Sequence, residues 1–310
     1  MEILEPAAGT LHGWFDRDLP PALTVDPGTT VRLGTLDSGW WTGPHVDGAP
    51  ELRERHPLHD PAFGHALTGP IAVRGAQPGQ VLAVGIGDVV PGAFGTTYSG
   101  LRSTALNERL GVTAAPVVHR WTLDTVAGTG RNQAGHSVAL RPFLGVMGVP
   151  PAEPGQHSTI PPYRHGGNLD CRELVAGATL YLPVTVPGGL LSVGDGHAAQ
   201  GDGEVSGTAI ECPLERVDLT LDVLPDLFGA PLQTPVARTP AGWLTMGVAD
   251  DLDEAMAVAL DAMLGVMAAL HGIGRSDALA LASVVVDLRI TQVVNQVVGV
   301  HAVLPWGALR

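Results

Sequence analysis

Cysteine is scarce in this chain. Cys171 and Cys212 are the only two among 310 residues. Domains that depend on a disulfide framework carry many more cysteines at regular spacings, so that class of fold is excluded. Each cysteine is expected to be a small buried residue in a reducing compartment. We therefore predict a cytoplasmic protein.

Basic side chains are also in short supply. Lys and Arg number 17 against 31 Asp and Glu, which gives a formal net charge of −14. Nucleic acids and anionic membranes are bound through basic patches, so we expect no nucleic-acid partner. The charge suits a small ligand that is neutral or cationic.

Segments that would direct the chain to a membrane are not apparent. The first residues, Met1–Pro6, lack a basic stretch followed by an apolar one, so no signal peptide is expected. The longest apolar stretch, Val284–Pro305, is interrupted by charged and amide side chains and is too polar for a membrane span. We expect no membrane partner.

Turn-forming residues divide the chain into short apolar runs. Aromatic residues make up only 5%, but the apolar content of 45% is ample for a core, and 41 Gly and 26 Pro separate the apolar segments. This pattern is typical of many short strands joined by turns. It predicts a mainly β protein with a β-sandwich or jelly-roll-like core.

Helical periodicity appears only near the C-terminus. Asp251 and Glu254 form a capping-box pattern, and apolar residues follow at helical spacing as far as Gly272. Ser276 is predicted to cap a second helix. We predict a single unit over residues 1–310, with a smaller α+β C-terminal part. Its β-rich core covers about 1–245, its helical element about 250–286, and its C-terminal strand segment about 287–310.

The chemistry is concentrated in the stretch Gly194–Glu204. Asp195 and His197 are two residues apart, as are Asp202 and Glu204, and glycines separate them. In extended backbone such pairs share a face, and the segment between them can reverse the chain. The spacing matches no zinc-finger, calcium-loop or phosphate-loop motif. Taken alone it allows a metal site, an acid/base site, or a glycine-rich hairpin whose aspartates bond the turn backbone.

This stretch resembles the GDxHxxQGDGE signature of the acetamidase/formamidase family. Four further segments resemble the same family, in the family's order and over nearly the whole chain: Leu67–Ile71, Arg74–Gly79, Gly145–Pro150 and Pro161–Asp170. The resemblance implies hydrolysis of short linear amides, of the formamide and acetamide type, to a carboxylate and ammonia. It also implies a small-molecule amide as partner and a homo-oligomer.

Candidate site residues are those that match the family's motif positions, together with the neighbouring His165. For catalysis we expect Glu204, Asp195 and His197, with a carboxylate such as Glu204 carrying the proton. The residues expected to bind substrate are Asn168, Gln200 and His165. Those expected to bind a divalent metal ion are Asp170, Asp195, His197 and Asp202. One histidine with several oxygen ligands favours zinc, with manganese or calcium as alternatives.

Three alternatives to this assignment stay open. The same scaffold could act on a larger or cyclic amide, with Trp40 and Trp41 lining a wide mouth. It could be a non-catalytic β-sandwich that binds a metal or small ligand. Cys171 or Cys212 could be a nucleophile paired with a carboxylate, although a buried structural role is favoured for both.

Overall fold

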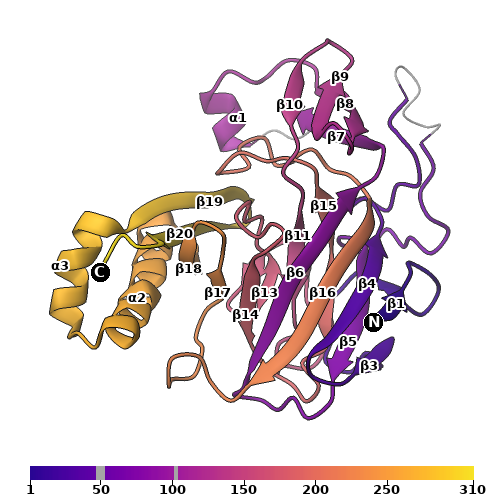
Figure 1. Cartoon of the computed structure of the whole chain (residues 1–310). Coiled ribbons are helices and arrows are strands. Elements are labelled where there is room, and N and C mark those ends of the chain that lie inside the picture. Colours follow the sequence, from indigo (N-terminus) through magenta and orange to yellow (C-terminus); the bar gives the residue numbers. More distant parts are fainter. Residues whose placement is uncertain (47–52, 101–103) are drawn as a thin grey trace.

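Short strands dominate the computed structural model, which describes residues 1–46, 53–100 and 104–310 (Figure 1). The prediction of a mainly β protein is confirmed. The largest sheet has nine strands, in the spatial order β1 (Glu2–Leu4), β4 (Thr29–Thr35), β16 (Leu214–Leu224), β6 (Val81–Pro91), β14 (Thr179–Pro183), β17 (Val236–Arg238), β18 (Gly242–Ala249), β20 (Val297–Pro305) and β19 (Asp287–Asn295).

A second sheet of seven strands packs against the first. Its order is β12 (Pro162–Tyr163), β13 (Gly166–Asn168), β11 (Phe143–Gly148), β15 (Leu191–His197), β5 (Leu67–Val73) and β2 (Leu11–His12), with β3 (Leu23–Val25) parallel to β5. Inward residues of both sheets, such as Val84 and Leu219 on one side and Ile71 and Val193 on the other, form one apolar core. The result is a β-sandwich, with β15 central in its second sheet.

A smaller four-stranded sheet stands above one end of the sandwich (Figure 1). It contains β10 (Ser137–Ala139), β9 (Thr129–Asn132), β8 (Val117–Asp124) and β7 (Phe94–Ser99), and the short helix α1 (Ala105–Arg109) follows β7 in sequence. Thr96 of β7 and Glu211 exchange two backbone hydrogen bonds, each 2.9 Å long, and so tie this sheet to the body. It will be called the overhanging sheet.

Two helices lie where helical periodicity predicted them, α2 (Leu252–His271) and α3 (Arg275–Val285). The predicted cap of α2 is confirmed, since the Asp251 carboxylate accepts from the Glu254 N–H at 2.9 Å and Gly272 ends the helix with a φ of 65°. The predicted cap of the second helix is wrong. Gly274 is its N-cap, and Ser276 lies inside the first turn.

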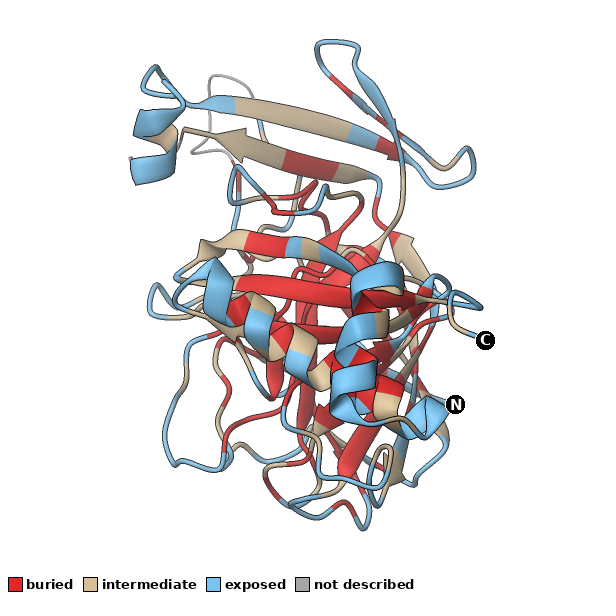
Figure 2. Ribbon diagram, turned by 90° about the vertical axis from the view of Figure 1, so that its left-hand side faces the viewer, coloured by how far each residue is buried: buried red, intermediate tan, exposed pale blue. Residues whose placement is uncertain are grey.

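Helix α2 packs its apolar side on the nine-stranded sheet. Ala255, Ala259, Met263 and Met267 form a second core with Val300 and neighbours on β20, and the outer face is exposed (Figure 2). By length and composition α2 is the one helix in the described ranges that could cross a membrane. Helices that pack in protein cores meet the same criteria, and α2 has this packing.

Candidate active site

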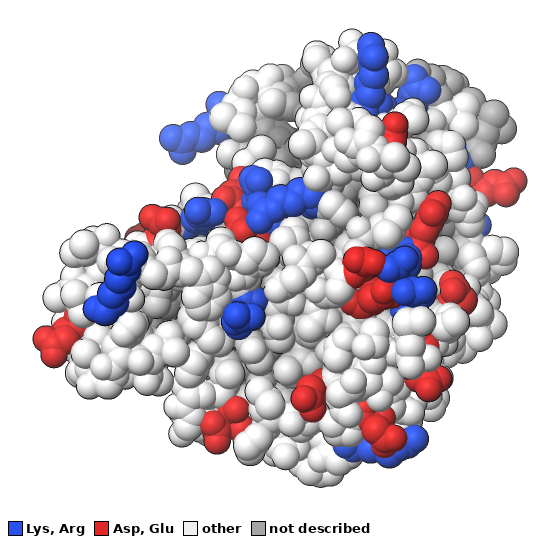
Figure 3. All heavy atoms as spheres, viewed as in Figure 1, with Lys and Arg blue, Asp and Glu red and all other residues white. Residues whose placement is uncertain are grey.

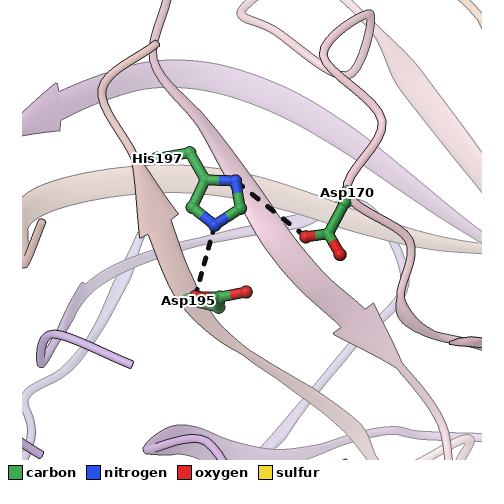
Figure 4. Close-up of side chains that lie close together, drawn as sticks. All are labelled: Asp170, Asp195 and His197. Carbon is green, nitrogen blue, oxygen red and sulfur yellow. Dashed lines mark ion pairs between the residues drawn. The ribbon is translucent and has the colours of Figure 1, made fainter. Parts of the chain in front are cut away.

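Asp195 and His197 lie two residues apart on β15 and their side chains meet, as expected. The His197 ring lies between two carboxylates (Figure 4). Its Nε2 is 3.3 Å from Asp195 Oδ1, and its Nδ1 is 3.9 Å from Asp170 Oδ1. Asp170 arrives from the loop after β13, so the two sequence segments that were expected to meet do meet here.

Glu211 and Glu204 complete the group of acidic side chains. Glu211 faces His197 across an antiparallel bridge, with its Oε2 3.3 Å from His197 Nε2. It is held there by Ser38 Oγ at 3.2 Å and by the Ala209 N–H at 2.8 Å. Glu204 lies close to both Glu211 and His197. One carboxylate oxygen each of Glu204 and Glu211 and a ring nitrogen of His197 lie within 4.8 Å of one another. These five buried residues will be called the acidic cluster: Asp170, Asp195, His197, Glu204 and Glu211.

Sequence reasoning missed Glu211. The only signal was its position, because a chain that reverses after Gly203 and runs back beside β15 brings a residue near 211 opposite His197. Motif spacing could not show this pairing, because it depends on where the reversal occurs.

Gly145 on β11 leaves the space that the acidic cluster occupies. A Cβ at this position would lie 2.5 Å from Asp195 Oδ2, 2.7 Å from Asp170 Oδ1 and 2.8 Å from His197 Cε1. No side chain fits at such distances. The backbone of β11 is therefore the floor beneath the cluster.

Three members of the cluster adopt left-handed backbone conformations. The φ angles are 47° at Asp170, 58° at Asp195 and 46° at Glu204. Residues other than glycine rarely adopt this region, and such strain concentrates at functional sites. The surrounding structure therefore holds these carboxylates in place at a cost in backbone energy.

Burial and mutual repulsion set the charges within the cluster. Burial raises the pKa of Asp170 to about 8 and that of Glu211 to about 7. Two causes raise the pKa of Glu204 well above its usual value: burial is the larger, and the negative charge of the neighbouring Asp170 is the second. Burial alone would lower the pKa of His197, but Glu211 and Asp195 raise it well above normal. Burial would likewise raise the pKa of Asp195, but His197 brings it below its usual value.

Several buried polar atoms of the site make no hydrogen bond with the described groups. Neither ring nitrogen of His197, nor Asp170 Oδ1, nor Gln200 Oε1 makes a hydrogen bond with any group that the structure describes, although all are buried. Buried polar atoms are normally satisfied. Two overlapping sets each offer ligand atoms within 4.8 Å of one another, Asp170–Asp195–His197 and His197–Glu204–Glu211. The donor set and the unpartnered atoms fit a divalent metal ion.

The other expected site residues lie at different distances from the cluster. Gln200 donates to the backbone oxygen of Asp170 at 2.7 Å. Asn168 donates to the Ile160 carbonyl at 3.0 Å, and its own Oδ1 is buried without a partner among the described residues. Both therefore flank Asp170.

Asp202 and His165 are not brought into the cluster. Asp202 is exposed. His165 Nδ1 donates to the Val149 carbonyl at 2.6 Å, and its ring stacks on Tyr163 and lines a separate hollow. Because the Val149 carbonyl can only accept, His165 Nδ1 carries the proton in that bond.

A cleft of about 410 Å³ opens beside the acidic cluster, between the Gly201 turn and the overhanging sheet. Its lining includes Trp121, Arg141, Arg172, Gln200, Asp202 and Glu204. Glu204 is the one member of the acidic cluster that lines this cleft. A small molecule in the cleft would therefore meet Glu204 before the rest of the cluster.

The tandem tryptophans are not part of this lining. Trp40 is buried, with its Nε1 donating to the Gly64 carbonyl at 2.9 Å. The guanidinium groups of Arg53 and Arg55 lie over the ring of Trp41 at 4.8 and 4.4 Å. In the described part of the chain this loop is therefore held by packing and cation–π contacts.

Both cysteines are free and buried, as predicted. Burial raises the pKa of Cys171 to about 12 and that of Cys212 well above its usual value. Since the thiolate is the nucleophile, these environments disfavour the cysteine alternative.

The chain is similar to known proteins of one family. The model of the acetamidase/formamidase family matches residues 4–156 and 152–306. Formamidase of Methylophilus methylotrophus is 29% identical over 253 residues, which cover 64% of this chain and 60% of that protein. Acetamidase of Mycolicibacterium smegmatis is 28% identical over 257 residues, 63% of this chain and 61% of that protein. The matched region thus spans about 60% of these curated relatives.

A solved structure resembles the chain over almost its full length. The acetamidase from Bacillus halodurans superposes with a TM-score of 0.84 at 26% identity, covering 98% of this chain and 97% of that one. The sandwich, the overhanging sheet and the C-terminal helices are therefore parts of a shared architecture.

Proposed function

The chain belongs to the acetamidase/formamidase family, and we propose that it hydrolyses short linear amides to a carboxylate and ammonia. The observation that carries this proposal is the position of Glu204, which belongs to the buried acidic cluster and also lines the cleft. This position supports a role for Glu204 as a proton carrier between a set of candidate metal-ligand atoms and a cavity of small-molecule size.

We propose that a divalent metal ion is held by Asp170, Asp195, His197 and Glu211, and that this ion is zinc. The dominance of carboxylate oxygens in this set also suits manganese or calcium. Bound there, the ion would polarise the amide carbonyl and lower the pKa of the attacking water. Asp202, which is exposed, is left out of this proposed ligand set.

Glu204 is the proposed proton carrier. As a carboxylate it takes a proton from the water that attacks the amide carbon, and a C–O bond forms. It then returns that proton to the nitrogen as the C–N bond breaks, so that ammonia leaves and the carboxylic acid remains. The buried, repulsive surroundings that raise its pKa favour the protonated form needed for the second step.

Two amide side chains are proposed to orient the substrate. Gln200 lines the cleft, and its Oε1 is buried without a partner among the described groups, so it can accept a hydrogen bond from the substrate N–H₂. Asn168 supports the same loop through its bond to Ile160. Because His165 lines a separate hollow, no role in substrate binding is proposed for it.

The chain as a whole, residues 1–310, is proposed to act as one unit within a homo-oligomer in the cytoplasm. Residues of the nine-stranded sheet come from both ends of the chain, which supports a single unit.

The test is ammonia release from formamide, acetamide and propionamide by purified protein, before and after chelator treatment and after adding back single metals. Release that disappears with chelator and returns with one metal supports both the amide reaction and the ion. Release that persists after complete metal removal contradicts the metal proposal. No release from the metal-loaded protein contradicts the proposed function.

A further inference from the structure

The cleft beside Glu204 contains a cationic group without a counterion. Arg172 lines the cleft, its Nε is buried without a hydrogen-bond partner, and it forms no ion pair with a carboxylate within the described ranges. A buried guanidinium nitrogen is normally bonded. The unpartnered atom therefore points to a ligand that supplies an acceptor.

Three arginines lie near this end of the cleft, namely Arg141, Arg172 and Arg289. Arg141, which also lines it, and Arg289 share a single carboxylate, Glu173, at 2.6 and 3.1 Å. The acidic groups in the lining are Asp202, which makes no ion pair in the described structure, and Glu204 of the acidic cluster. Basic side chains, with acidic ones among them, gather on this face beside β19 (Figure 3). The overall charge of −14 therefore does not describe the cleft.

Guanidinium groups are suited to one class of anion. All 17 basic residues of the chain are arginines, and the planar fork of arginine binds carboxylates through two parallel hydrogen bonds. Arg172 is two residues after Asp170, so their Cα atoms are at most about 7 Å apart. A chain of a few carbons can span from the acidic cluster to this guanidinium.

We propose that the preferred substrate is a short amide whose acyl chain ends in a carboxylate. This inference rests on the proposed function and assigns its substrate class. The terminal carboxylate binds Arg172, with Arg141 beside it, while the amide group lies at Glu204. Hydrolysis of such a substrate yields a dicarboxylate and ammonia, with water as the only co-reactant.

The first test compares two amides with the same four-carbon skeleton, succinamate and butyramide, which differ by a carboxylate in place of a methyl group. Wild type is expected to show a kcat/KM for succinamate at least tenfold above that for butyramide. In Arg172→Gln this ratio should fall at least tenfold, mainly through KM, and Arg172→Lys should restore part of it. The control Arg164→Gln, at an exposed arginine outside the cleft, should keep the wild-type ratio.

Equal kcat/KM values for the two amides in wild type, or a ratio unchanged by Arg172→Gln, would overturn the inference while the amide reaction stands. A binding measurement decides the case in which no amide is hydrolysed. By calorimetry, succinate should bind wild type at least tenfold more tightly than butyrate, and Arg172→Gln should remove the difference. Succinate binding that does not depend on Arg172 would overturn the inference whatever the outcome for catalysis.

Discussion

Glu204 is buried at 7% exposure yet reaches the cleft, which makes it the most informative single residue. Glu204→Gln keeps the shape of the side chain and removes its ability to carry a proton. We expect kcat to fall by about 10²- to 10⁴-fold, the usual contribution of a general acid or base. Stability should be unchanged or slightly increased, because a buried carboxyl with a raised pKa is replaced by a neutral amide.

The measurement is kcat for acetamide together with the thermal midpoint, with Glu215→Gln on the exposed side of β16 as the control. A loss of less than tenfold in Glu204→Gln would assign the proton transfer to another group.

Gly145 offers a test of the packing beneath the cluster. In Gly145→Ala the new methyl group would lie 2.5 to 2.8 Å from Asp195, Asp170 and His197, so these side chains must move. Displacements of about 1 Å at a catalytic site can cost roughly 10²-fold in rate. We expect a loss of that size in kcat/KM, with a cost of about 1–3 kcal/mol in the free energy of unfolding from overpacking. Wild-type activity in this variant would show that the cluster geometry is not required.

At this scale the sequence predicted part of the cluster. Asp195 and His197 were expected on one side of a strand and do meet, although the backbone at Asp195 is left-handed, and the resemblance supplied Asp170 and Glu204. Glu211 was not found, because its contact with His197 depends on the return path of the chain. Asp202 was expected beside Glu204 since the two alternate in sequence, but the left-handed φ of 46° at Glu204 interrupts an extended run.

Helix α2 contains a glycine that no contact requires. Gly265 is exposed in the helix interior, and a Cβ there would meet nothing within 4 Å. Glycine in a helix interior costs roughly 0.5–1 kcal/mol relative to alanine. Gly265→Ala is therefore expected to raise the free energy of unfolding by about that amount, measured by denaturant titration.

Gly265→Ala also serves as the matched control for Gly145→Ala, because both are glycine-to-alanine changes and only one lies at the acidic cluster. Its activity should equal that of wild type. A decrease in stability would mean that this part of α2 is not in regular helical conformation.

Elements with strong local signals were the ones predicted. The cap at Asp251 and the left-handed Gly272 are determined by nearby residues, and both were placed correctly. The order of the nine strands was not predictable, because neighbours such as β4 and β16 are nearly 200 residues apart and no local pattern encodes their pairing. The strands of the overhanging sheet carry weak signals, since β8 and β10 are mostly exposed or half-buried and show little alternation.

At the scale of the whole molecule, buried neutral histidines couple folding to pH. Burial lowers the pKa of His12 to about 4, and the rings of His165 and His301 are affected in the same direction. His12 is 8% exposed, and its ring bonds the Trp14 carbonyl at 2.7 Å and Ser192 Oγ at 3.0 Å. The unfolded chain takes up a proton near pH 6.5, whereas the folded protein does so only near pH 4.

The stability that His12 contributes is therefore complete above about pH 6.5 and is lost as the pH falls towards 4. Near pH 5.5 the unfolded state holds almost one more proton at His12 than the folded state does. The free energy of unfolding therefore changes by about 1 kcal/mol per pH unit from this residue. His12→Gln should lower stability at neutral pH but reduce the slope between pH 6 and 5 by about that amount. The acidic cluster, with several raised pKa values, contributes in the opposite sense, so only the difference between variants isolates His12.

The measurement is a set of denaturant titrations from pH 7.5 to 5, with chelator present so that metal binding does not contribute. His271→Gln, which removes an exposed ring from the last turn of α2, should keep the wild-type slope because that ring is in water in both states. If His12→Gln has the wild-type slope as well, His12 does not enter the folded protein as a neutral ring. The acid sensitivity would then have to come from His165 or His301, whose pKa values are also lowered by burial, and the same comparison at each of the two separates them.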